Sequence, residues 1–238
     1  MPPANSEPGL GYSDRKVRLS FSDWYFTHRH SVLFVSLLLT LILGPVTQEF
    51  GLPSWPVELL YLMNLAAAAF GLDRSRWRKG AAAVVISTAA LRFVGRWSNL
   101  GGVSELATVL FVGLAALAAV SSLRFAFQGK GVDRERLCAA LSTYLLAGHM
   151  YGVGYWQIEQ LRAGSFAVSG APVAAGALDL PTCVYFSFVT LATLGYGDIA
   201  PLTPTARGLA VSEAIIGQLY LAVLIARLVG GRPKDTPE

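Results

Sequence analysis

Two glycines and a carboxylate interrupt an apolar stretch near the end of the chain, in residues 190–201 (TLATLGYGDIAP). Gly195 and Gly197 can adopt backbone angles that are closed to other residues, which allows successive carbonyl groups to point the same way. Such carbonyls offer partial negative charge without an ionised group, which suits a monovalent cation that must enter and also leave. Divalent cations usually recruit carboxylates, and residues 193–197 contain none. The spacing therefore predicts backbone carbonyls that replace the water around a bare monovalent cation.

The residues before this site predict a short helix that enters a membrane without crossing it. Residues 181–194 are apolar, but a full crossing needs about 20 residues. Pro181 suits the first helical position, and Asp179 just before it is a candidate cap. Non-helical backbone at membrane depth is tolerated only where it is buried in protein or lines water. We therefore expect residues 193–197 to line a water-filled path.

The composition is that of a membrane protein. Of the 238 residues, 53% are hydrophobic and 14% are charged, against about 25% charged in soluble domains. No apolar core precedes residue 31, so we expect no cleaved signal peptide. Six apolar segments are long enough, or nearly so, to span a bilayer. They are residues 31–47, 56–72, 80–94, 103–127, 137–161 and 205–229, of which 80–94 is the shortest.

The distribution of Lys and Arg predicts the orientation of these spans. Most of the 19 basic residues lie before the first span, between the second and third, between the fourth and fifth, and after the sixth. The positive-inside rule then places both termini in the cytoplasm. We expect the membrane to be a bacterial inner membrane or a plasma membrane. Because the basic residues lie in short loops, the net charge of +4 indicates membrane orientation and no nucleic-acid binding. The aromatic residues of 19–30 predict an interfacial segment, with an undecorated tail as the alternative.

Residues 190–198 (TLATLGYGD) resemble the filter of the potassium channel pore family, whose TVGYG loops are a standard example of a carbonyl filter. The resemblance covers residues 134–230. It implies that K⁺, as the permeant ligand and without any cofactor, is bound by the carbonyls of four residues and the hydroxyl of the first. Those residues are Thr193, Leu194, Gly195 and Tyr196. It also implies a homotetramer, because one chain contributes only one filter strand.

The same resemblance assigns supporting roles around the filter. Gly197 closes the filter toward the outside, and Tyr185 and Phe186 pack around it. Tyr185 could donate a hydrogen bond to Asp198, which alternatively attracts cations at the mouth. The chain departs from the family pattern at Leu194, where Val is commoner, and at two other supporting positions. Those positions are Ala192, in place of a common Thr, and Val189, where some relatives carry an acid.

The sixth segment is expected to line the cavity below the filter. Gly217 falls where the family often has a hinge glycine. After it, one polar and three apolar residues recur at helical spacing on one face: Gln218, Leu221, Ile225 and Val229. By the resemblance this face lines the cavity and forms an apolar gate; the alternative is that it packs against the fifth span.

Two further features admit more than one interpretation. Glu213 is an intramembrane carboxylate, either a regulatory group or a structural group bonded to the pore-helix backbone, Tyr144 or His149. The run Tyr151-Gly-Val-Gly-Tyr155 has the composition of a filter but lies in a continuous apolar segment. We interpret its glycines as close helix packing.

These observations predict an all-α membrane protein with six transmembrane helices and a re-entrant pore helix and filter between the fifth and sixth. We expect three parts: a cytoplasmic N-terminal segment with the interfacial stretch, a four-helix accessory bundle, and the pore domain. They occupy residues 1–30, 31–127 and 128–238. The fourth span carries only Arg124 near its cytoplasmic end and Glu105 near its outer end. A voltage sensor needs several arginines, so we expect no strong voltage sensing.

The function predicted is passive, potassium-selective conduction. The alternatives are a nonselective cation channel, since Gly-Tyr-Gly also occurs there, and a secondary transporter, whose broken helices also line ion sites. Only one broken segment is present, whereas transporters usually pair them. An enzyme is not expected, because no His, Asp or Ser cluster has metal or triad spacing. Apart from membrane lipid and other copies of the chain, no partner is indicated, and no soluble ligand-binding domain is expected.

Overall fold

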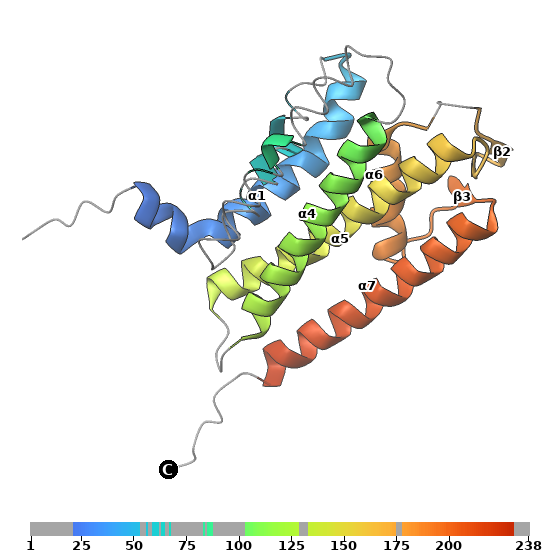
Figure 1. Ribbon diagram of the computed structural model, residues 1–238. Coiled ribbons are helices and arrows are strands. Elements are labelled where there is room, and N and C mark those ends of the chain that lie inside the picture. Colours follow the sequence, from blue (N-terminus) through green and yellow to red (C-terminus); the bar gives the residue numbers. More distant parts are fainter. Residues whose placement is uncertain are drawn as a thin grey trace, which may run out of the picture.

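The computed structural model describes residues 21–52, 103–128, 133–174 and 178–230, with scattered positions between 56 and 87. This part of the chain is mostly helical (Figure 1). The helices are α1 (Phe21–Glu49), α4 (Val103–Phe127), α5 (Arg134–Leu161), α6 (Leu180–Leu191) and α7 (Pro204–Gly230). Three short strands, β1 (Phe166–Val168), β2 (Ala171–Pro172) and β3 (Ile199–Pro201), lie between the last helices.

Three of the described helices contain a segment that is long and apolar enough to cross a membrane. They are Thr27–Thr47 in α1, Thr108–Phe127 in α4, and Pro204–Gly230, which is α7 itself. The fifth expected span forms α5, but this helix does not reach the same hydropathy because glycines, tyrosines, His149 and small hydroxyl residues interrupt its apolar interior. The second and third expected spans, 56–72 and 80–94, lie mostly outside the described residues.

Helix α1 is bent where the expected interfacial stretch meets the first span. His28 has φ −112° and ψ 16°, which lies outside the helical region, and Figure 1 shows the beginning of α1 turning away from the bundle. The interruption leaves backbone N–H groups without helical partners. Glu135, at the beginning of α5, accepts from the N–H of His30 at 3.2 Å and of Ser31 at 3.4 Å. A carboxylate from α5 thus caps the membrane-spanning part of α1.

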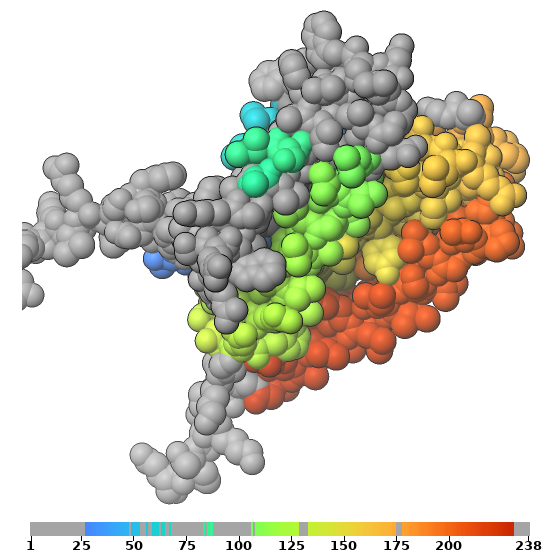
Figure 2. Space-filling view, viewed as in Figure 1, coloured from blue at the N-terminus to red at the C-terminus, as the bar shows by residue number. Residues whose placement is uncertain are grey.

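Helix α5 is the central element, because α1, α4, α6 and α7 all pack against it (Figure 1). Figure 2 shows part of α5 between α4 and α7. Asp133 accepts from the N–H of Arg136 at 2.8 Å and so caps α5, which begins three residues before the expected span. A short connection from α4 makes α4 and α5 an antiparallel pair. Apolar side chains fill the space between α1, α4 and α5: Leu33, Leu37, Ala115, Ala118, Leu145 and Leu146.

The Gly-Val-Gly run at 152–154 lies inside the continuous helix α5, as predicted. A Cβ atom on Gly152 would lie 2.7 Å from Cα of Val184 in α6. On Gly148, one turn earlier, it would lie 2.5 Å from the ring of Phe188. These glycines therefore allow α6 to approach the backbone of α5, and the interpretation as helix packing is confirmed for Gly152. A Cβ atom on Gly154 would make only an ordinary contact, 3.5 Å from Leu209.

The strands form a small antiparallel sheet in the order β2-β1-β3. Val168 of β1 pairs with Ile199 of β3, and Phe166 pairs with Pro201. The sheet connects the loop after α5 to the residues that follow the Gly-Tyr-Gly-Asp run. Its position at one end of the bundle (Figure 1) fixes where the chain leaves α6 and enters α7.

Candidate ion-binding site

Helix α6 delivers the chain to the candidate site and then stops. Asp179 accepts from the N–H of Thr182 at 2.9 Å, so the expected N-cap is present, and Pro181 lies in the first turn. The helix ends at Leu191, three residues before the end of the apolar segment 181–194. The N–H of Ala192 still donates to the carbonyl of Phe188 at 3.0 Å. Beyond Ala192 the backbone is no longer helical.

The backbone of residues 193–197 alternates between two conformations. Thr193, Gly195 and Gly197 have φ of 56°, 57° and 78°, whereas Leu194 and Tyr196 between them do not have positive φ. Alternation of left-handed and ordinary residues turns successive peptide groups toward the same side of the chain. Positive φ at Thr193 is unusual because its side chain is β-branched, and such strain gathers at functional sites. This geometry is what a row of carbonyls aimed at one cation requires.

Hydrogen bonds hold residues 193–197 at the end that follows α6. The N–H groups of Thr193 and Leu194 donate to the carbonyls of Thr190 and Val189, each at 2.9 Å. Gln218 of α7 donates through Nε2 to the hydroxyl of Thr193 at 2.9 Å. The strained threonine is thus bonded both to the end of α6 and to α7.

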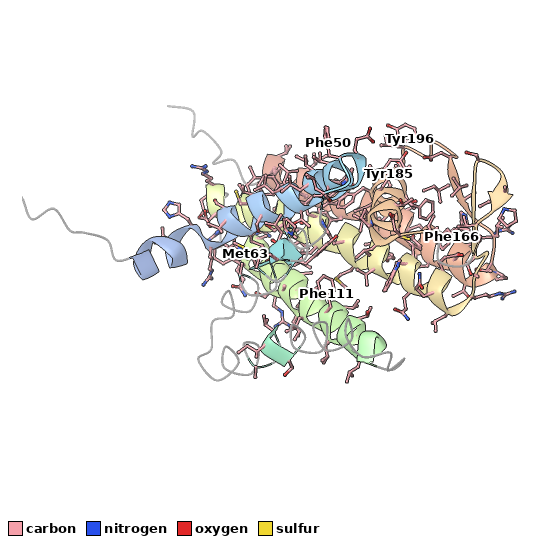
Figure 3. All side chains as sticks on the ribbon, turned by 90° about the horizontal axis from the view of Figure 1, so that it is seen from above. Phe50, Met63, Phe111, Phe166, Tyr185 and Tyr196 are labelled. Atoms are coloured by element: carbon pink, nitrogen blue, oxygen red, sulfur yellow. The ribbon has the colours of Figure 1, made fainter. Side chains whose placement is uncertain are left out.

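The outer end is fixed through Asp198. The phenol of Tyr185 donates to Oδ2 of Asp198 at 2.8 Å, which is the bond that the sequence suggested. The N–H of Ser169, in the β1–β2 turn, donates to the backbone carbonyl of Asp198 at 2.9 Å. Figure 3 shows Tyr185 and Tyr196 on the same side of the molecule. The side chain of Asp198 therefore bonds back to α6, while its backbone joins the sheet.

Phe186 packs on a different side of α6 from Tyr185. It is 6% exposed and packs edge-on against Tyr155 of α5, with ring centroids 4.9 Å apart, and against Phe166 of β1. Within one chain Phe186 therefore lies between α5 and the sheet, and its packing around an assembled filter stays a prediction. One residue along a helix rotates a side chain by about 100°, so Tyr185 and Phe186 cannot both face the strand.

The candidate site is open on one side. Leu194 and Tyr196 are 56% and 66% exposed, and residues 192–198 are all exposed. A shallow apolar cavity of about 420 Å³ lies beside them, between α1 and α6. Its lining includes Gly44, Pro45, Val189, Leu194 and Tyr196. A single chain therefore covers the candidate site from one side only.

Helix α7 presents different faces to the rest of the chain. Its buried residues are Ala206, Glu213, Gly217 and Leu224, which face α5 and α6. Of the expected cavity residues, Ile225 and Val229 are 59% and 69% exposed, Gln218 is exposed, and Leu221 is half-buried. Within one chain, Ile225 and Val229 do not pack against α5.

Gly217 lies against the end of α6. A Cβ atom there would be 2.5 Å from the carbonyl oxygen of Leu191. Real Cβ atoms do not approach backbone that closely, so only glycine fits without a shift of one helix. The structure therefore gives Gly217 a packing role, whereas the hinge role remains an expectation.

Glu213 is fully buried and has partners other than those expected. Tyr155 of α5 donates to its Oε2 at 2.5 Å, and the Ser187 hydroxyl of α6 contacts its Oε1. Tyr144 and His149 do not bond to it. His149 instead pairs its Nδ1 with the carbonyl of Leu145 at 2.8 Å. Sequence reasoning missed Tyr155 and Ser187 because neither carries a pattern beyond apolar helix.

Comparisons with known proteins agree with this geometry. Residues 159–230 match a family model described as "Ion channel". This range holds the sheet, α6, the candidate site and α7. The segment that contains the candidate site is therefore similar to ion channels.

Individual relatives narrow the class. The chain is 35% identical over 86 residues to "Two pore potassium channel c" of Oryza sativa subsp. japonica, covering 36% of this chain and 17% of that protein. It is 46% identical over 46 residues to "Two-pore potassium channel 5" of Arabidopsis thaliana (19% and 11%). It is 33% identical over 84 residues to "Inward rectifier potassium channel Kirbac3.1" of Paramagnetospirillum magnetotacticum (34% and 24%). The matched segment is therefore similar to parts of proteins that are named as potassium channels.

These relatives are matched over less than a quarter of their own length. No solved structure matches the chain.

Proposed function

We propose that four copies of this chain form a potassium-selective channel that passes K⁺ passively across a membrane. The observation that carries the proposal is the alternating backbone of Thr193, Gly195 and Gly197, exposed on the open side of the chain. Carbonyls of residues 193–196 from four chains would surround an axis and replace the hydration shell of K⁺. The names of the matched relatives support potassium as the ion.

In the proposed assembly, the open side of the site faces the symmetry axis. Gln218, Leu221, Ile225 and Val229 then line the path below the filter, and the exposure of Gln218, Ile225 and Val229 within one chain supports this placement. In this proposal residues 128–238 are the pore domain and residues 31–127 are the accessory bundle, of which α1 and α4 pack against α5. We further propose six spans, with both termini cytoplasmic as the positive-inside rule requires.

Flux in reconstituted vesicles tests this function. The full chain is purified, its oligomeric state is measured by mass, and it is placed in liposomes with potassium or sodium gradients. We expect a tetramer and a potassium flux that clearly exceeds the sodium flux. Equal fluxes of the two ions would favour a nonselective cation channel, and coupled uphill movement of a second solute would favour a transporter.

A further inference from the structure

The polar cluster around Glu213 lies behind the candidate filter and joins three helices. Glu213 of α7, Tyr155 of α5 and Ser187 of α6 are each 0% exposed. They are distant in sequence, 58 residues apart for Tyr155 and 26 for Ser187. Ser187 also approaches the carbonyl of Gly148 in α5, at 2.7 Å. The chain of contacts therefore runs from Tyr155 through Glu213 and Ser187 back to α5.

Counting hydrogens along this chain gives the protonation state of the carboxyl group. Three oxygen–oxygen contacts must be filled: Tyr155 to Glu213, Glu213 to Ser187, and Ser187 to the Gly148 carbonyl. Each hydroxyl supplies one hydrogen, and a carbonyl supplies none. An ionised Glu213 leaves two hydrogens for three contacts, so two oxygen lone pairs would face each other. A neutral carboxylic acid supplies the third.

The surroundings of Glu213 also disfavour a charge. Among the described residues, no Lys, Arg or His lies within ion-pair distance of it. The titratable groups that face it are Tyr155 and, within electrostatic range, Tyr144 of α5, and neither is a cation. An isolated carboxylate buried away from water is very costly, so such groups are paired or neutral.

We infer that Glu213 is a neutral carboxylic acid that positions α7 against the pore helix α6 and so holds the base of the filter in place. This inference rests on the proposed function. Within six residues of α7, three contacts reach α6 and the filter: Glu213 to Ser187, Gly217 to the Leu191 carbonyl, and Gln218 to Thr193. The acid fixes the register in which the other two contacts form.

Infrared spectroscopy tests the protonation state without requiring conduction. The reconstituted full chain is compared with Glu213→Gln at neutral pH. We expect the C=O stretching band of a protonated carboxyl group in the wild-type protein and its loss in the variant. Absence of this band in the wild-type protein would overturn the inference.

Selectivity tests the positioning role. In Glu213→Gln the amide oxygen can accept from Tyr155 and the amide N–H can donate to Ser187, so the potassium-to-sodium flux ratio should stay within about twofold. Glu213→Leu and Tyr155→Phe remove hydrogen bonds, and we expect their flux ratios to fall roughly tenfold. Tyr151→Phe is the matched control, because its hydroxyl has only a 3.5 Å contact to Ser212. Its flux ratio should equal that of the wild-type protein.

The two proposals fail in different ways. A wild-type protein that passes no potassium refutes the proposed function, while the infrared band still decides the state of Glu213. A conducting wild-type protein whose Glu213→Gln variant loses selectivity as fully as Tyr155→Phe refutes the inference alone. Should Glu213→Leu not assemble, the comparison of Glu213→Gln, Tyr155→Phe and Tyr151→Phe remains decisive.

Discussion

At the scale of single residues, the candidate filter depends on backbone conformation more than on side-chain chemistry. Gly195 and Gly197 have positive φ, yet nothing lies within 4 Å of the place that a Cβ atom would occupy on either. A substitution there meets no neighbour within the chain and acts through the backbone. Gly217 is the opposite case, since its φ is ordinary and its surroundings leave no room.

Gly197→Ala should therefore lower selectivity without unfolding the chain. An L-residue held in a sparsely populated backbone region costs ~1–3 kcal/mol, so the strand should relax to another conformation and misdirect its carbonyls. We expect the potassium-to-sodium flux ratio to fall or flux to cease. Gly170→Ala is the control, because Gly170 also has positive φ and open space but lies in the β1–β2 turn. Normal selectivity in assembled Gly197→Ala channels would contradict the filter assignment.

Gly217→Ala distinguishes packing from a hinge. A methyl group forced against the Leu191 carbonyl overpacks the contact between α6 and α7, at a cost of about 1–3 kcal/mol. We expect the melting temperature of the tetramer in detergent to fall. Gly208→Ala, on the same helix with open space around it, should leave it unchanged or raise it, because alanine favours a helix. An unchanged melting temperature with altered opening would support the hinge instead.

At the scale of elements, helix α7 lies between the interior of the chain and the proposed ion path. One face buries Glu213, Gly217 and Leu224, and its lower end is held by two further bonds. Tyr220 donates to the carbonyl of Ala140 at 2.5 Å, and Arg227 donates to the carbonyl of Phe127 at 2.6 Å. Through Arg227 the lower part of α7 is joined directly to the end of α4.

Single cysteines in α7 should map these faces. In a background without Cys138 and Cys183, cysteines at 218, 221, 225 and 229 should react with a water-soluble thiol reagent from the cytoplasmic side. The reaction should alter flux, because we expect these positions to line the path. Leu224→Cys should not react, since Leu224 is 7% exposed and packs with Ala139 and Ala140. An inert Ile225→Cys beside a reactive Leu224→Cys would show that the cavity face is assigned wrongly.

At the scale of the whole molecule, helices α1 and α4 pack against α5 of the proposed pore domain, and α4 lacks the series of arginines that a voltage sensor needs. The described part of α4 carries Arg124 in its last turn, near the Arg227 contact rather than in the middle of the span. One charge crossing 100 mV is worth only ~2.3 kcal/mol. The accessory bundle therefore supports the pore mechanically in our proposal.

Open probability should accordingly vary weakly with voltage. In planar bilayer recordings we expect a shallow dependence over physiological potentials, and the same slope in Arg124→Gln. Arg92 and Arg96 lie outside the described residues, so their neutralisation belongs in the same experiment. Steep opening that disappears when the three arginines are neutralised would reverse this prediction.

The sequence alone located the candidate filter because its determinants are consecutive residues. A half-length apolar helix, a capping Asp179 and two alternating glycines all lie within residues 179–197, and the structure contains each of them. Helix α4 has the predicted bounds, and α7 differs by one residue at each end. These elements were predictable because hydrophobic length and local capping decide where a membrane helix begins and ends.

Only the tertiary structure decided which faces meet. Helical periodicity places Phe186 and Glu213 on faces but does not say which neighbour covers them. That depends on how α5, α6 and α7 pack, which Gly148, Gly152 and Gly217 control by letting backbones approach. Close packing permits few arrangements of side chains, and in this one Phe186 turns toward the sheet and Glu213 meets Tyr155 and Ser187. The positive φ of Thr193 has the same origin, because contacts from two helices hold a residue whose own preference is otherwise.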